Sequence, residues 1–188
     1  LSAEEAKRFG MLGSKVFRKI ESLPIPVIAA VNGFCLGGGM EIAMSCDIRL
    51  ASENARLGQP EVGLGITPGF CGTQRLAKLV GLAKANELIL TAKQIKAPEA
   101  EKIGLVNHVY PLENLMEEAE KLANVIANNA PVAVRAAKEA IGLSMRTDID
   151  AGIMIESNLF AHCFTTNDRV NAMQAFVDKT PAKPFENK

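Results

Sequence analysis

The sequence VIAAVNGFCLGGGMEIAMSC, residues 27–46, decides the fold, and GQPE follows it at residues 58–61. The apolar run that opens this stretch predicts a buried strand, and its glycine triplet predicts a tight turn. The residues after the triplet include no helix breaker and predict a helix. Glu41 falls in the first turn of that helix, and Glu61 follows twenty residues later. The pattern is strand, glycine turn and helix, with two carboxylates.

This layout indicates acid–base chemistry beside a backbone that can bind an anion. Glycine has no Cβ, so a ligand can approach the main chain closely. The first turn of a helix has N–H groups without an internal partner, and they can hold an oxyanion. One such donor contributes roughly 3–4 kcal/mol of transition-state stabilisation. Glu41 and Glu61 could divide acid and base work if their environments separate their pKa values.

The residues that follow the turn exclude two other glycine-loop functions. No Gly-Lys-Ser or Gly-Lys-Thr sequence follows the glycine triplet, which excludes a P-loop. The third position of a dinucleotide fingerprint would fall on Ile42, where glycine or alanine is needed. A plain tight turn with an ordinary surface Glu41 remains the structural alternative.

Composition favours one domain, with room for an appendage. The 188 residues are 48% hydrophobic, which is enough to bury one core. The 21 basic and 21 acidic residues give a net charge of zero, so neither a nucleic-acid surface nor a membrane patch is expected. No apolar run approaches the ~20 residues of a membrane span. The start of the chain lacks the basic and apolar regions of a signal peptide.

The four cysteines have no CxxC pairing and no histidine at zinc spacing. We expect reduced, mostly buried thiols in a cytoplasmic protein. A catalytic cysteine is the less favoured alternative, because no matching base is evident. Arg75 could bind a phosphate or form an internal salt bridge. His108 is expected to be structural and to have no partner.

Helices are predicted at both ends of the chain. Ser2 and Glu5 form a capping box for a first helix, whose apolar face is Phe9, Leu12, Val16 and Ile20. Residues 63–72 are rich in breakers and predict an irregular loop that lines a pocket. After residue 115 three or four apolar helices follow, one starting at Pro131 and one capped by Thr166. Residues 182–188 are expected to be a loose tail.

Several motifs, in order and at family spacing, resemble the enoyl-CoA hydratase (crotonase) family. They are AAVNG at 29–33, GGGxE at 37–41, CD at 46–47, GQPE at 58–61 and PGxxGTQRL at 68–76. The resemblance runs from about Pro26 to the C-terminus. It is closest to the bacterial short-chain branch of 3-hydroxybutyryl-CoA dehydratase type.

The resemblance implies an α/β fold in which β-β-α units wind into a superhelix. Residues 1–125 would be the C-terminal part of the crotonase core, holding only the later units. Residues 126–188 would be a helical region that forms a trimer, or a hexamer made of two trimers. Family members are usually longer, so we expect an N-terminally truncated chain with an incomplete site and weak or no turnover alone.

The resemblance also implies catalytic roles. Glu41 and Glu61 match the two catalytic glutamates, which hold a water while Glu61 exchanges a proton with the α-carbon. The reaction is the reversible syn hydration of a short-chain trans-2-enoyl-CoA, such as crotonyl-CoA, to the 3-hydroxyacyl-CoA. Gly38 matches the glycine whose N–H binds the thioester oxygen, and Gly37 and Gly69 line the same pocket.

More distant substrate contacts are implied as well. Phe160 and Lys179 match positions that meet the adenine end of coenzyme A, often from a neighbouring subunit. Coenzyme A is part of the substrate, and neither a metal nor a bound cofactor is expected. The chain would be a lyase of fatty acid and butyrate metabolism. Cys71 departs from the family pattern, which has a glycine there.

Other functions remain open beside the hydratase. The same fold hosts enoyl-CoA isomerases, dehalogenases and thioester hydrolases, and fold alone does not select among them. Isomerases commonly lack one of the two glutamates, so the presence of Glu41 and Glu61 favours a hydratase. A non-catalytic assembly module, or an RNA-binding protein, is the alternative outside enzymes. Zero net charge disfavours RNA binding, and the two glutamates disfavour a purely structural module.

Overall fold

The structure is a computed structural model that describes residues 1–188, and it divides into two compact units. Unit 1 comprises residues 1–23 and 27–119, and unit 2 comprises residues 24–26 and 120–188. Each unit is described by itself. None of the helices combines the length and the apolar character that crossing a bilayer requires.

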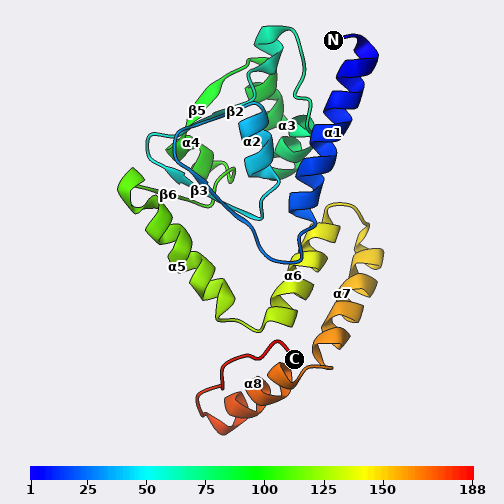
Figure 1. Ribbon diagram of the computed structural model, residues 1–188, viewed down its shortest axis with the longest axis vertical. Helices are drawn as coiled ribbons and strands as arrows, with labels where there is room; N and C mark the ends of the chain where they lie inside the picture. Colours follow the sequence, from blue (N-terminus) through cyan, green and yellow to red (C-terminus); the bar gives the residue numbers. More distant parts are fainter. The chain divides into compact units, whose positions relative to one another are not determined.

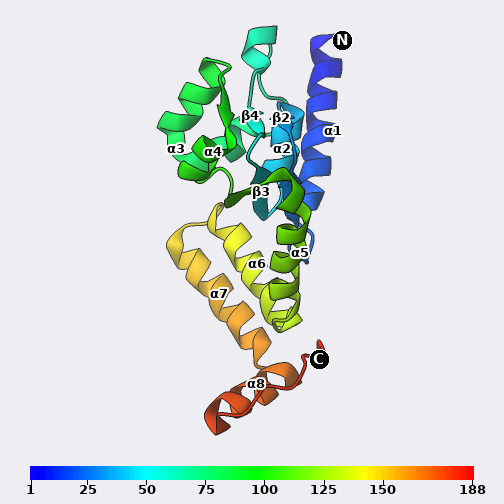
Figure 2. The same ribbon diagram turned by 90° about the vertical axis from the view of Figure 1, so that its left-hand side faces the viewer.

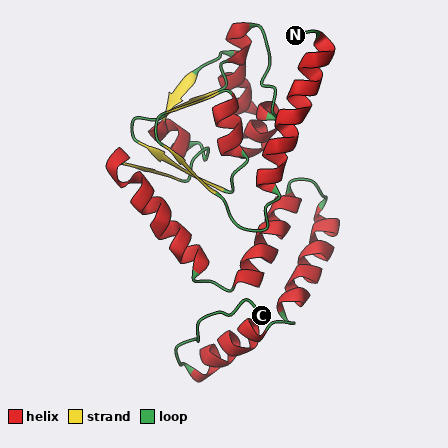
Figure 3. Cartoon of the chain, in the orientation of Figure 1, coloured by secondary structure: helices red, strands yellow, loops and turns green.

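Unit 1 contains every strand, together with the helices that precede and separate the strands (Figures 1 and 3). In chain order its elements are α1 (Ala3–Glu21), β1 (Ile28–Val31), β2 (Phe34–Leu36), α2 (Gly38–Met44), β3 (Ile48–Ser52), β4 (Arg56–Gly58), the 3-10 helix η1 (Glu61–Leu64), α3 (Gly72–Leu90), β5 (Gln94–Lys96), α4 (Ala97–Lys102), β6 (His108–Tyr110) and the 3-10 helix η2 (Leu112–Asn114).

Unit 2 is helical. Helix α5 (Leu115–Ala127) begins in unit 1 and ends in unit 2, where α6 (Pro131–Ser144), α7 (Ile149–Cys163) and α8 (Asn167–Asp178) follow. As predicted, Pro131 begins its helix and Thr166 caps the last one, its hydroxyl accepting the Arg169 N–H at 3.2 Å. Helices α6 and α7 pack against each other (Figure 2).

Two three-stranded sheets form the framework of unit 1. One has the order β1-β3-β6 and is parallel throughout, with Ile28 opposite Ile48. The other has the order β2-β4-β5, where β2 and β4 are parallel and β5 is antiparallel to β4. The α/β class is confirmed, and so is the strand predicted before the glycine turn, which is β1. Strands β2 and β5 were not predicted, and each is defined by its pairing with β4.

The core of unit 1 lies where α2 and α3 meet the two sheets. Its largest fully buried apolar side chains are Met40, Leu50, Leu57, Leu76, Leu88, Ile95, Leu105 and Leu115. Helix α3 has a break at Gly81, whose φ of 79° and ψ of 161° split it in two. This packing holds α2, and hence the glycine turn before it, at a defined place beside β4.

The helix α1 and its capping box are confirmed, but most of its predicted apolar face is exposed in the single chain. Phe9 and Leu12 are 58% and 62% exposed, and Val16 is also exposed. The helix contacts Phe70 through Gly13 and through the rings of Phe9 and Phe17. Periodicity identified the helix but could not show which of its residues make this contact.

The predicted loose tail is also wrong. The Asp168 carboxylate at the start of α8 accepts the N–H groups of Glu186 and Asn187, at 2.7 and 2.8 Å. Arg135 of α6 adds a side-chain bond to Asn187 at 2.7 Å. Because Asp168 is buried, water cannot reach its carboxylate, and these two N–H groups supply the hydrogen bonds that its oxygens need. The C-terminal residues are therefore tied to unit 2.

Candidate active site

The glycine turn is closed by hydrogen bonds to strand β4. Gly37 has φ 54° and ψ −124°, a conformation that a side chain would strain. Its N–H donates to the Gly58 carbonyl at 3.0 Å, and its carbonyl accepts the Gln59 Nε2 at 3.2 Å. Because β2 and β4 pair in parallel, the turn after β2 and the segment after β4 emerge at the same edge. Glu41 and Glu61 follow those two strands and are thereby brought together.

Glu41 is buried and held by backbone donors. Its side chain is 1% exposed, and Oε1 accepts the N–H of Phe70 at 2.8 Å and of Gly72 at 2.7 Å. Phe70 lies in the irregular loop that precedes α3, and Gly72 is the first residue of α3. The position of Gly72 requires glycine, because a Cβ there would lie 2.8 Å from Glu41 Oε1. The loop thus fixes one oxygen of Glu41 as a bound acceptor.

Glu61 begins the 3-10 helix η1 and points back toward the glycine turn. A Cβ added at Gly37 would lie 3.1 Å from Glu61 Oε1. Glu61 is 9% exposed, and its Oε2 is buried without a hydrogen-bond partner in the protein. Burial raises the pKa of Glu61, its own backbone N–H partly offsets this, and the charge of Glu41 raises it further. A raised pKa suits a group that must carry a proton near neutral pH.

The predicted site residues separate into two groups. Gly37, Gly38, Glu41 and Glu61 are brought together, and Gly69 precedes the Phe70 N–H that binds Glu41. Phe160 and Lys179 lie in unit 2, where Phe160 is an exposed residue of α7 and Lys179, with φ 54°, follows the last residue of α8. Their contact with coenzyme A remains a prediction.

Sequence reasoning missed Gln59 as part of the site. Its side chain is fully buried, its Nε2 donates to Gly37, and its Oε1 has no partner in the protein. That oxygen faces the Gly72 backbone, 2.5 Å from where a Cβ would stand. The only sequence signal was its place beside Glu61 in GQPE. Gln59 links the glycine turn to the loop that holds Glu41.

Arg75 was expected either to bind a phosphate or to form an internal salt bridge, and in the structure it forms the salt bridge. Its Nε lies 2.6 Å from Glu21 Oε1 at the end of α1, and its Nη1 donates to the Phe70 carbonyl at 2.8 Å. Arg75 is buried, so these bonds engage it within the protein. The expectation that His108 has no partner is wrong, since its Nδ1 lies 3.8 Å from Glu101 Oε1 at an exposed position.

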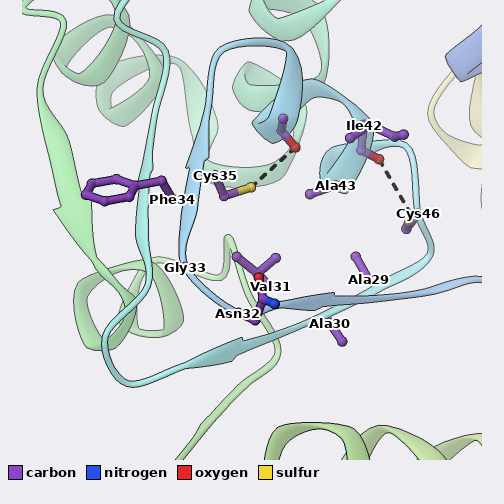
Figure 4. Close-up of a pocket in the computed structure, with 11 residues that line it drawn as sticks. Ala29, Ala30, Val31, Asn32, Gly33, Phe34, Cys35, Ile42, Ala43 and Cys46 are labelled. Carbon is purple, nitrogen blue, oxygen red and sulfur yellow. Dashed lines mark hydrogen bonds between the residues drawn. The ribbon is translucent and has the colours of Figure 1, made fainter. Parts of the chain in front are cut away.

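A pocket lined by Cys35 and Cys46 lies beside β1, β2 and α2 (Figure 4). It has a volume of about 300 Å³, and neither Glu41 nor Glu61 lines it. All four cysteines are free, but only Cys35 is buried, so the expectation of mostly buried thiols is wrong. The pKa of Cys35 is raised to about 11, mainly by burial and to a lesser extent by the neighbouring Cys46. Cys35 is therefore a neutral thiol near pH 7, which disfavours the nucleophile alternative there.

No group of three or more His, Cys, Asp or Glu side chains is arranged to hold a metal ion. The chemistry available to the two carboxylates is proton transfer beside a backbone that can bind an oxyanion.

Comparisons with known proteins agree with this geometry. The family model for enoyl-CoA hydratase/isomerase matches residues 2–188. The chain is 59% identical to the short-chain-enoyl-CoA hydratase of Clostridium acetobutylicum, over 98% of this chain and 70% of that one. It is 63% identical to the short-chain-enoyl-CoA hydratase of Clostridioides difficile, over 80% of this chain and 96% of the relative. The crystal structure of enoyl-CoA hydratase from Bacillus anthracis superposes with a TM-score of 0.94 at 40% identity, covering 100% of this chain and 72% of that one.

Proposed function

We propose that this chain, which belongs to the enoyl-CoA hydratase/isomerase family, hydrates short-chain trans-2-enoyl-CoA thioesters reversibly. Two similar relatives carry the name short-chain-enoyl-CoA hydratase. The observation that carries the proposal is the pair of buried carboxylates at one glycine turn. Glu41 has one oxygen anchored by two N–H groups, and Glu61 has one oxygen without a partner. Such a pair can hold one water between a proton acceptor and a proton donor.

The two glutamates divide the proton transfers. In the hydration direction, the water oxygen bonds to the β-carbon while Glu41 accepts a proton from that water. Protonated Glu61 gives its proton to the α-carbon, so both new bonds form on one face of the double bond. The raised pKa of Glu61 favours the protonated form that this step consumes. Dehydration reverses both transfers, and exchange with solvent restores the starting protonation.

The backbone beside the glutamates stabilises the charge that develops. As water adds, electron density moves to the thioester oxygen, which becomes an enolate. We expect the N–H of Gly38, in the first turn of α2, to donate to that oxygen. One such donor is worth roughly 3–4 kcal/mol in the transition state. Gly37 and Gly69 leave the adjoining main chain open to the substrate.

We further propose that residues 126–188 form the oligomerisation region of a cytoplasmic trimer or hexamer. Large apolar side chains on α7 and α8 support this, because they are exposed in the single chain: Ile149, Ile153, Met154, Phe160, Val170, Met173, Phe176 and Val177. A helical surface this apolar is typical of an interface between subunits. Phe160 and Lys179 would then reach the adenine of a coenzyme A bound by a neighbour. Light scattering on the purified protein tests the assembly, and a monomer would refute it.

The proposed activity is tested by the loss of the conjugated-enoyl absorbance of crotonyl-CoA. The assay uses the full native chain that carries these residues, and its Glu61→Gln variant. We expect rapid loss in the unsubstituted protein and a fall in kcat of about 10²–10⁴-fold in the variant. A folded protein that binds crotonyl-CoA without consuming it would refute the hydratase and favour an isomerase or another CoA-thioester enzyme.

A further inference from the structure

The ring of Phe70 lies between helix α1 and the glycine turn that begins α2. A Cβ added at Gly13 of α1 would overlap this ring, so the ring rests directly on the α1 backbone. On the other side, a Cβ at Gly38 would lie 3.7 Å from ring atoms Cδ2 and Cε2, which is van der Waals contact. The ring therefore fills the space between α1 and Gly38, and α1 runs alongside α2 in both views (Figures 1 and 2).

Two other aromatic rings of α1 hold Phe70 in place. The centroid of Phe9 lies 5.2 Å from that of Phe70 at an interplanar angle of 66°. The centroid of Phe17 lies 5.5 Å away at 88°. Edge-to-face arrangements of this kind are favoured by the ring quadrupoles. The Phe70 ring is thus one member of a three-ring cluster, with α1 behind it.

The backbone of Phe70 is fixed as firmly as its side chain. Its N–H donates to Glu41 Oε1, and its carbonyl accepts from Arg75 Nη1, both at 2.8 Å. Arg75 is in turn paired with Glu21 at the end of α1. Phe70 could not move outward without breaking the hydrogen bond that positions Glu41. The ring is therefore a rigid part of the wall beside the two glutamates.

The acyl group of the proposed substrate must pass close to this ring. When the thioester oxygen accepts the Gly38 N–H, the carbonyl carbon stands beside Gly38. The α- and β-carbons then extend toward Glu41 and Glu61. The Phe70 ring touches Gly38, and the backbone N–H of Phe70 holds Glu41, so we expect the ring to border the space beyond the β-carbon. Additional methylene groups would meet an aromatic ring that α1 prevents from retreating.

We infer that Phe70 sets the acyl-chain length, and that its ring admits a four-carbon enoyl group while excluding an eight-carbon one. This inference rests on the proposed function, because Gly38 as carbonyl donor defines where the acyl chain begins. Its physical basis is close packing, since an immobile ring cannot make room for several methylene groups. Phe70 is thereby a specificity-determining residue in addition to positioning Glu41.

Two substitutions should change the selectivity in opposite directions. Phe70→Ala opens the space, so kcat/KM for trans-2-octenoyl-CoA relative to crotonyl-CoA should rise at least about tenfold. Gly13→Ala adds a methyl group that presses the ring toward Gly38, and the same ratio should fall. Leu82→Ala, at an exposed position of α3, is the matched control and should leave the ratio unchanged. Thermal melting establishes that each variant is folded, and Phe70→Leu serves if Phe70→Ala is not.

Binding of saturated thioesters separates this inference from the proposed function. Butyryl-CoA and octanoyl-CoA lack the double bond and cannot be hydrated, so calorimetry reports chain-length preference without turnover. Tighter binding of butyryl-CoA that Phe70→Ala abolishes would support the inference, even if crotonyl-CoA were not hydrated. Rapid crotonyl-CoA hydration with a kcat/KM ratio that changes less than about threefold in folded Phe70→Ala and Phe70→Leu proteins would overturn it.

Discussion

Substitution of Gly72 by alanine should impair catalysis more than it impairs the fold. A Cβ at Gly72 would lie 2.5 Å from Gln59 Oε1, 2.8 Å from Glu41 Oε1 and 2.9 Å from Pro68 Cβ. These three distances are all shorter than a Cβ tolerates, and the atoms come from three separate segments. The new methyl group cannot be accommodated by one side chain moving aside.

The size of the effect follows from what must move. Overpacking at a buried site costs about 1–3 kcal/mol of stability. For a chain of this size, each kcal/mol lowers the melting temperature by roughly 2–4 °C. The displaced Glu41 also loses or lengthens its bond from the Gly72 N–H, now 2.7 Å. A misplaced catalytic carboxylate should lower kcat by about 10²-fold.

Two measurements on the same protein test this reasoning. Initial rates with crotonyl-CoA give kcat, and thermal unfolding gives stability. The matched control is Gly142→Ala in α6, where a Cβ meets nothing within 4 Å. An alanine inside that helix should raise stability by about 0.5–1 kcal/mol and leave kcat unchanged. The reasoning is refuted if folded Gly72→Ala protein retains kcat within about threefold of the unsubstituted enzyme.

Three further predictions concern stability. Burial raises the pKa of Glu61 in the folded protein above the ordinary glutamate value of about 4.3. The protein therefore keeps its full stability below that ordinary value and loses part of it as pH rises through the folded-state pKa, because Glu61 must then ionise in a buried place. Denaturant unfolding should therefore show Glu61→Gln to be more stable than the unsubstituted protein at pH 8, with the difference vanishing near pH 4; an equal or lower stability at pH 8 would contradict this. Cys71 adopts φ 75°, so Cys71→Gly should raise stability by about 1 kcal/mol in the same assay, and a loss of stability would argue against backbone strain there. Asp168→Ala removes the acceptor of two backbone N–H groups, which should cost about 2–3 kcal/mol and accelerate amide hydrogen exchange at Glu186 and Asn187, whereas unchanged exchange would show that the tail is held by other contacts.

Local patterns were sufficient for most of the secondary structure. The capping box at Ser2, the apolar strand before the glycine turn and the helix that starts at Pro131 each depend on neighbouring residues alone. The two glutamates were singled out from the sequence because carboxylates beside a glycine turn and a helix start are typical of acid–base chemistry, and their catalytic role stays a prediction. Family motifs then ordered these features along the chain.

Features that depend on distant contacts were missed or misjudged. Strand β5 exists because it pairs with β4, and its three residues carry no pattern of their own. The contact side of α1 is set by the Phe70 ring, which lies more than fifty residues away along the chain. The C-terminal residues are ordered by Asp168, whose role depends on the tail folding back to α8.

The sequence by itself determined the α/β class, the glycine turn and the identity of the two carboxylates, because each is encoded within a few residues. Only the tertiary structure decided how those carboxylates differ. Parallel pairing of β2 with β4 brings Glu41 and Glu61 to one edge, where the loop before α3 and the first residue of α3 supply two donors to Glu41 and none to Glu61 Oε2. Burial and hydrogen bonding are properties of three-dimensional surroundings, so two identical side chains acquire different roles only once the chain has folded.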